Sequence, residues 1–323
     1  MGLFGALSYS EEEDAKKVVD FMEPATTLLT NFLPCFFIPA LIVAPLATRG
    51  ISNSDIGKFL AIISIGLPSL LAFTGHLVQG LQAATGTGTP KSNKKKSKKS
   101  KNKVAKYTSW FSPSLEKMFA AGTLGLGALS LKIPGLKHAF YVSTTFLAFI
   151  FGSRIPRHFP PAVRSFWHPL MSTYTVASAV FLVFAKVAGM PFFDLLQEYF
   201  VGGGSPFTAA GNFIMFWLEP SIISFAFGLY ARRKLLFANF VPIMAGTFIS
   251  TLAGIFTMAT LNKVLDPPHD LKMALLPRAT AALAVVQAAT IGASTSLTTV
   301  NCVITGIMGA NFAPKLNDLF FIR

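Results

Sequence analysis

The chain has few charged residues for its length. Aspartate, glutamate, lysine and arginine make up 13% of 323 residues, against ~25% in an average soluble domain. Hydrophobic residues make up 52%, and the mean hydropathy is +0.55. Many apolar runs approach the ~20 residues that a helix needs to cross a bilayer. The scarcity of charge therefore argues against a soluble globular protein and favours an integral membrane protein.

The residue patterns of common enzyme and metal sites are also missing. The two cysteines, Cys35 and Cys302, lie in separate apolar segments, where a thiol behaves as a small hydrophobe. There is no nucleophile elbow, no P-loop and no His, Cys and Asp cluster at metal-ligand spacing. We therefore expect no catalytic residue, no cofactor and no metal, and we predict that the protein is not an enzyme.

Acidic residues are scarce relative to basic ones, 14 against 28. Nine lysines lie between Lys91 and Lys106, and other basic clusters occupy short loops, from Arg154 to Arg164 and from Arg232 to Lys234. This distribution is typical of charge that sets the orientation of membrane helices. Contact of the lysine run with anionic lipid is the alternative. A nucleic-acid partner is not expected, since no nucleic-acid-binding motif accompanies the charge.

The apolar segments predict the fold class. They cover about residues 27–46, 56–81, 115–131, 138–151, 167–188, 207–230, 235–261, 271–290 and 294–312. Proline interrupts several of them, and membranes tolerate such a break where protein covers it or where it lines a cavity. We predict an all-α polytopic transmembrane bundle with about 8–9 apolar segments and discontinuous, proline-broken helices. Whether segments 271–290 and 294–312 cross the membrane or re-enter it is left open.

Residues 85–107 divide the chain. They are mostly Gly, Thr, Ser, Asn and Lys, a composition that cannot bury a core, so we predict a basic disordered linker. The membrane parts before and after it are residues 1–84 and 108–323. If the linker lies on the inner side, the main basic clusters and the N-terminus all fall on that side, as the positive-inside rule requires.

Two ionisable residues inside apolar segments are the candidate site. Arg278 follows Pro277, and Glu219 precedes Pro220. A charge at bilayer depth is costly and by default marks a functional site, and broken helices place free helix ends at the same depth. Our hypothesis is that Arg278 holds a substrate carboxylate while Glu219 balances charge or carries a coupled proton, with Thr280 completing the substrate-binding set. A structural ion pair, or side chains that reach the interface, is the alternative.

A run of hydroxyls follows the Arg278 segment. Ser294, Thr295, Ser296, Thr298 and Thr299 lie within six positions of one another. They either line a polar pathway or bond back to carbonyls of their own helix.

Several segments resemble the LrgB/CidB membrane protein family. Residues 275–278 (Leu-Leu-Pro-Arg) and 304–312 (Ile-Thr-Gly-Ile-Met-Gly-Ala-Asn-Phe) carry the resemblance, and residues 218–234 resemble an earlier block. Residues 31–46 resemble the end of the LrgA/CidA family. An LrgA-like part joined to an LrgB-like part is the arrangement of the plant plastidal members. A Gly, Ser and His-rich motif that continues the family pattern is not found in residues 317–323, so the resemblance predicts a truncated LrgB-like part.

The resemblance implies a carrier of small organic anions, namely 2-hydroxycarboxylates such as glycolate and glycerate. It implies the plastid inner envelope if the source is eukaryotic and photosynthetic, and another cell or organelle membrane otherwise. Bacterial relatives imply the alternative, a holin- or antiholin-like protein that modulates murein hydrolase export or lysis. A non-transporting remnant is the third reading. Membrane lipids and a second copy of the chain are the other partners considered.

Overall fold

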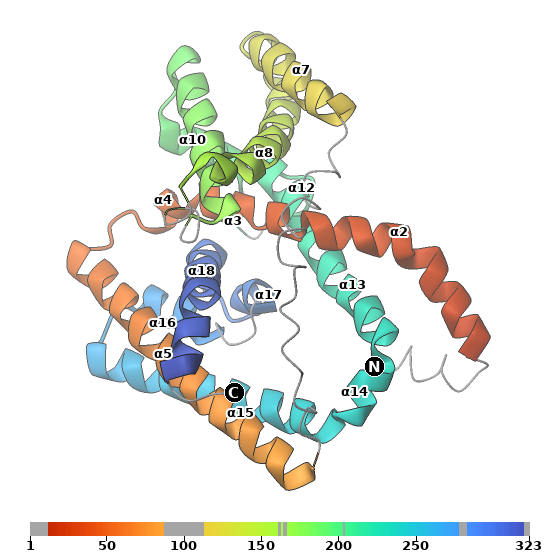
Figure 1. Ribbon diagram of the computed structural model, residues 1–323. Coiled ribbons are helices and arrows are strands. Elements are labelled where there is room, and N and C mark those ends of the chain that lie inside the picture. The colour runs from red at the N-terminus through yellow and green to blue at the C-terminus, as the bar shows by residue number, and fades with distance from the viewer. Residues whose placement is uncertain are drawn as a thin grey trace.

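The computed structural model describes residues 12–86, 113–160, 163, 167–202, 204–277 and 283–319, and these residues contain helices and no strand (Figure 1). The all-α prediction is confirmed. Among the described residues, five helices are long and apolar enough to cross a membrane. They are Lys16–Ile42, Asn53–Thr85, Pro169–Val187, Ala210–Ala231 and Phe240–Leu265. The expected 8–9 apolar segments outnumber these five spans, which are counted within the described residues alone.

The helices before residue 87 form one continuous and one broken span. α2 (Glu12–Phe36), α3 (Ile38–Ile42) and α4 (Ala44–Ala47) follow one another with breaks at Phe37 and Val43. α3 and α4 each have a proline within their first two residues, where the missing N–H costs no helical hydrogen bond. α5 (Asn53–Thr85) is continuous despite Pro68. The predicted break by proline is therefore confirmed in the first span, while α5 continues through Pro68.

The helices after residue 112 are more numerous and several are short. They are α7 (Pro113–Ser130), η1 (Pro134–Leu136), α8 (Lys137–Arg154), η2 (Ile155–His158), α10 (Pro169–Val187), α11 (Phe192–Tyr199), α12 (Ala210–Phe216), α13 (Leu218–Ala231), α14 (Arg233–Ala238), α15 (Phe240–Leu265), α16 (His269–Leu275), α17 (Leu283–Thr290) and α18 (Thr295–Leu319). α16 and α17 have 7 and 8 residues, so neither alone reaches the ~20 residues of a span.

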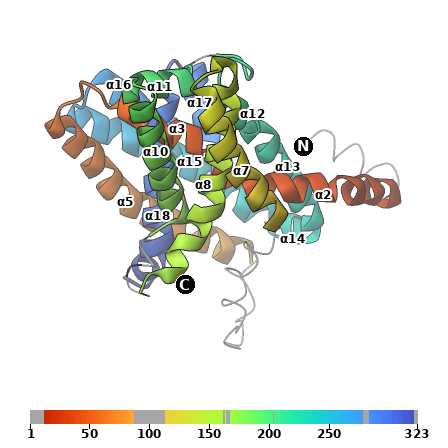
Figure 2. The same cartoon turned by 90° about the horizontal axis from the view of Figure 1, so that it is seen from above.

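Helices from the two sequence halves pack together. α5 lies along α15, and α2 lies along α13. A Cβ built on Gly246 of α15 would lie 3.2 Å from Val78 of α5, so the two helices approach closely there. α7, α8 and α10 pack as a second group, with Phe140, Phe181 and Tyr199 in its buried aromatic core. The N-terminal half of α2 projects away from the bundle (Figures 1 and 2). The division into parts 1–84 and 108–323 stays a prediction, and the linker with Lys91 and Lys106 lies largely outside the described residues.

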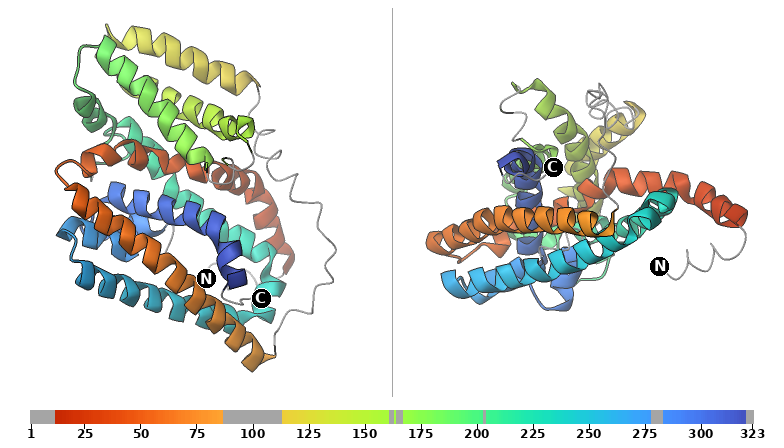
Figure 3. Two further views of the ribbon diagram at one scale, coloured as in Figure 1. Left: turned by 60° about the vertical axis from the view of Figure 1, so that its left-hand side comes forward. Right: turned by 60° about the horizontal axis from the view of Figure 1, so that its bottom comes forward.

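The helix ends fall into two groups on opposite sides of the bundle. Arg154 pairs with Glu116 at 2.8 Å, which joins the end of α8 to the start of α7. Lys58 donates to the Asp266 carbonyl at 3.2 Å, and Lys137 pairs with Glu198 at 3.0 Å. In the left view of Figure 3, the starts of α2 and α7 lie on the same side as α14, and α11 lies on the opposite side. This grouping agrees with the predicted topology; which side is the inner one stays a prediction.

Candidate functional site

The structure locates three of the five predicted site residues. Glu219 and Pro220 lie in the first turn of α13, and Pro277 lies just after α16. Arg278 and Thr280 lie outside the described residues. The span Ala210–Ala231 that carries Glu219 is broken at Trp217, between α12 and α13. The sequence hypothesis of an ionisable residue at a helix break therefore describes the position of Glu219 correctly, while its role is still a hypothesis.

Glu219 borders a pocket of about 560 Å³, here called the Glu219 pocket. The α12–α13 break forms one wall. The α17–α18 turn forms another with Thr290 and Thr295, and Phe200 and Asn212 also line the pocket. Glu219 is an exposed side chain in this opening. The turn between α17 and α18 thus lies beside the acidic residue of the α12–α13 break.

A second pocket of about 500 Å³ adjoins the first and is called here the Ser294 pocket. The two pockets share Phe200, Ala289 and Thr295. Val43, Leu46 and Ala47 of the α3–α4 break also line the second pocket. The helix breaks α3–α4, α12–α13 and α17–α18 therefore meet around two adjoining pockets.

The α17–α18 turn brings both backbone donors and hydroxyls to these pockets. The Leu297 N–H donates to Ser294 Oγ at 3.3 Å, so Ser294 caps the start of α18. Ser294, Thr295 and Ser296 line the Ser294 pocket, while the Thr299 hydroxyl donates to the Thr295 carbonyl at 2.8 Å. Thr299 thus bonds back to its own helix, and the reading of the other hydroxyls as part of a polar pathway stays a prediction. The first turn of a helix favours anions, through its N–H groups and its dipole.

Asn212 is a residue that the sequence reasoning missed. It is 8% exposed, and its side-chain amide makes three hydrogen bonds to the loop after α11. Its Oδ1 accepts from the Val201 N–H at 2.9 Å, and its Nδ2 donates to the carbonyls of Val201 at 2.9 Å and Gly204 at 3.0 Å. The backbone is close on this side, since a Cβ on Gly211 would lie 2.9 Å from the Tyr199 carbonyl. Asn212 therefore holds the loop that carries Phe200 and Gly202 into the pockets.

α11 lies beside the site, with Gln197 lining the Ser294 pocket. Tyr199 at its end is fully buried and forms a 3.0 Å hydrogen bond with the Thr145 hydroxyl. Burial raises the pKa of the Tyr199 phenol above its usual value, so the group stays neutral. Lys137 pairs with Glu198 one position earlier. These contacts fix α11 against α8 and hold Phe200 in place. Among the described residues, no three His, Cys, Asp or Glu side chains are grouped to bind a metal.

Comparison with known proteins places the chain in a family. It is 27% identical over 315 residues to the plastidal glycolate/glycerate translocator 1, chloroplastic, of Arabidopsis thaliana. The aligned region covers 96% of this chain and 59% of the relative, so the chain spans less than two thirds of the relative's length. No solved structure matches significantly. A model of the LrgB-like family matches residues 145–323. This match covers more than half of the chain and confirms the resemblance found in the sequence: the chain belongs to the LrgB-like family.

Proposed function

We propose that the chain is an integral membrane carrier of small 2-hydroxycarboxylates such as glycolate and glycerate. The observation that carries the proposal is the meeting of three helix breaks around two adjoining pockets in an otherwise apolar bundle. Broken helices supply backbone donors and acceptors at membrane depth, which carriers use to bind polar cargo. The kinship with a translocator of glycolate and glycerate supports the choice of substrate.

The chemistry of the pocket walls suits a small hydroxy acid. The carboxylate would lie at the first turn of α18, where the backbone N–H groups and the Thr295 hydroxyl can donate to it. The hydroxyl group of the substrate would donate to Glu219 across the Glu219 pocket. Arg278 precedes the start of α17 by five positions, and we propose it as the second carboxylate contact, with Pro277, Pro220 and Thr280 shaping the helix ends.

The proposed membrane is the plastid inner envelope if the source is photosynthetic and eukaryotic. The Arabidopsis relative is named as a chloroplastic protein. In any other source the same carrier would lie in another cell or organelle membrane.

The test is exchange of substrate by the purified chain in liposomes. Vesicles loaded with glycerate should take up external glycolate, and absence of exchange by folded protein would refute the proposal. Thr295→Val removes one hydroxyl at constant shape, and we expect KM for glycolate to rise roughly 10-fold, the usual loss for a hydrogen bond to a charged group. Thr251→Val is the matched control. The Thr251 hydroxyl bonds back to the Thr247 carbonyl at 2.8 Å within α15 and lines neither pocket, so exchange should not change.

Two further variants test the assigned charges. Glu219→Gln should uncouple glycolate uptake from an imposed pH gradient if Glu219 carries the proton, and should leave the coupling intact if it only balances charge. Arg278→Gln should abolish exchange while the protein stays in the membrane; unchanged exchange would refute the assignment of Arg278. Leakage of an uncharged dye-sized solute separates a carrier from a holin-like pore, because only the pore releases the dye.

A further inference from the structure

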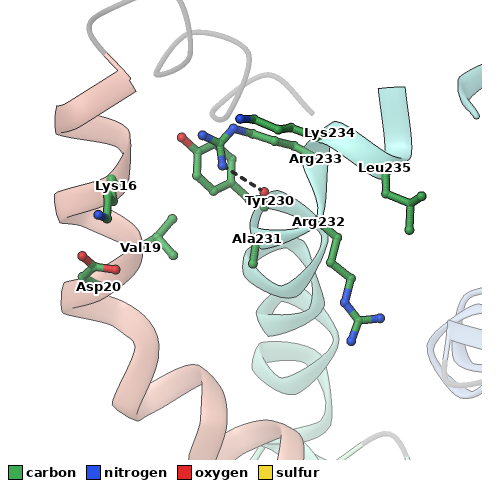
Figure 4. Close-up of a pocket in the computed structure, with 9 residues that line it drawn as sticks. All are labelled: Lys16, Val19, Asp20, Tyr230, Ala231, Arg232, Arg233, Lys234 and Leu235. Atoms are coloured by element: carbon green, nitrogen blue, oxygen red, sulfur yellow. Dashed lines mark hydrogen bonds between the residues drawn. The ribbon is translucent and has the colours of Figure 1, made fainter. Parts of the chain in front are cut away.

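A basic pocket of about 830 Å³ lies far from the helix breaks, between the start of α2 and the junction of α13 with α14. Five charged residues and a tyrosine line most of it: Lys16, Asp20, Tyr230, Arg232, Arg233 and Lys234 (Figure 4). Four cations and one carboxylate thus line the pocket. The excess of positive charge in a concave site favours an anionic ligand.

Tyr230 positions Arg233, one of the cations at the start of α14, by stacking. The Arg233 guanidinium lies 4.4 Å from the centre of the Tyr230 ring, within the range of a cation–π contact. Its Nη1 also donates to the Tyr230 carbonyl at 3.5 Å. Figure 4 shows the Arg233 and Lys234 side chains extending toward the side of the pocket where α2 carries Lys16 and Asp20. Arg232 points away from α2 in the same view. Arg233 and Lys234 are therefore the cations of α14 that face the pocket.

The pocket lies at the depth of lipid headgroups. Arg232 directly follows the span Ala210–Ala231, and Lys16 is the first residue of the span Lys16–Ile42. Residues at the ends of two spans lie near the interface between hydrocarbon and water. Val19 and Leu235 supply apolar lining beside the cations. A ligand with a phosphate head and a hydrocarbon tail fits both kinds of lining.

We propose that this pocket binds the phosphate group of an anionic phospholipid and thereby joins α2 to the α13–α14 junction. Basic pockets between membrane helices on the positively charged side are a known kind of lipid headgroup site. Arg233 and Lys234 would bind the phosphate oxygens, with Lys16 opposite them. Asp20 would accept a hydrogen bond from a headgroup hydroxyl, as the glycerol of phosphatidylglycerol provides. This inference is independent of the proposed carrier function.

The experiment measures lipid binding to the purified full chain in zwitterionic nanodiscs, with phosphatidylglycerol as the probe. Thermal unfolding and native mass spectrometry report the bound lipid. We expect phosphatidylglycerol to raise Tm, and the Arg233→Gln/Lys234→Gln variant to bind it roughly 25-fold more weakly, at about fivefold for each surface cation removed. Lys234→Gln alone changes one exposed side chain and should show the fivefold part. The matched control is Lys117→Gln/Arg157→Gln, which removes two exposed cations on the same predicted side, outside this pocket.

A competition with inorganic phosphate separates the two sources of the phosphate group. If millimolar phosphate does not displace phosphatidylglycerol, the ligand is a lipid. If phosphate alone gives the same rise in Tm, and the double variant abolishes that rise, the site takes a soluble phosphate compound. The proposal of a phosphate site is overturned if the pocket variants bind phosphatidylglycerol as the wild-type chain does, or if the control variant loses as much binding as they do.

Discussion

Replacing Asn212 by alanine tests whether one buried amide positions the loop at the candidate site. Its side chain bonds Val201 through both the N–H and the carbonyl, and Gly204 through the carbonyl. Alanine removes all three bonds and leaves the buried side of the loop without these partners. Because the loop lies beside Phe200, the loss should also move the shared wall of the two pockets.

The magnitude follows from the number of bonds. Each intramolecular hydrogen bond contributes ~1 kcal/mol net, so the three together give ~3 kcal/mol of local stability. A change of this size corresponds to roughly 100-fold faster opening of the loop. Asn212→Asp should be at least as damaging, because its second oxygen would face two carbonyl oxygens where the amide now donates at 2.9 and 3.0 Å. Asn239→Ala is the control, since the Asn239 side-chain bond to Leu235 at 3.1 Å is exposed.

Hydrogen exchange of the Val201 amide measures the effect directly, because that N–H donates to Asn212. In Asn212→Ala we expect exchange at Val201 to be about 100-fold faster while amides within α10 and α15 keep their protection. In Asn239→Ala the exchange at Val201 should match that of the unmodified chain. Wild-type exchange at Val201 in a folded Asn212→Ala protein would refute the reasoning that the amide holds the loop.

Two further predictions concern packing and pH. Gly152→Ala should lower the free energy of unfolding by about 1–3 kcal/mol in thermal unfolding, because the new Cβ would lie 2.5 Å from the Thr173 backbone nitrogen. Gly125→Ala is the control and should be neutral or slightly stabilising, because the space around Gly125 is open. Equal losses of stability in the two variants would contradict the argument. His168 caps α10 by accepting from the Leu170 N–H at 3.2 Å, and burial lowers its pKa. Its stabilising contribution is complete above the unfolded pKa of about 6.5 and is lost as the pH falls through the lower folded value. Tm should therefore decrease as the pH is lowered below ~6.5. The decrease should be smaller in His168→Asn, which keeps a capping side chain that does not titrate.

The sequence predicted which segments are helical better than it predicted which helices pack against one another. Low charge and long apolar runs were enough for the all-α class, and the Glu219–Pro220 pair indicated a break that the structure places at Trp217. The packing of α5 on α15 could not be predicted, because both neighbours of a membrane helix, lipid and protein, are apolar. α15 illustrates this, since Val241, Phe248 and Phe256 are all exposed on a helix that also packs on α5.

Asn212 could not be predicted for a related reason. A single asparagine in an apolar segment belongs to no recognisable spacing pattern. Its structural role depends on hydrogen bonds to a loop that begins 11 positions earlier, at Val201. Composition alone also could not show that the apolar segment 271–290 contains two short helices, α16 and α17.

The break beside Glu219 shows why polar chemistry collects where the helices are interrupted. Pro220 has no N–H, and its ring would clash with the Phe216 carbonyl in a continuous helix. The chain breaks at Trp217 instead, and the Ser221 N–H and hydroxyl both donate to the Trp217 carbonyl, at 3.1 and 2.7 Å. The Ser221 hydroxyl thus places a polar side chain beside this break, and Ser294 caps the start of α18. These two breaks thus bring hydroxyls and helix ends together. Two such breaks border the Glu219 pocket, which makes it a better location for a hydroxy acid than any continuous helix surface of the bundle.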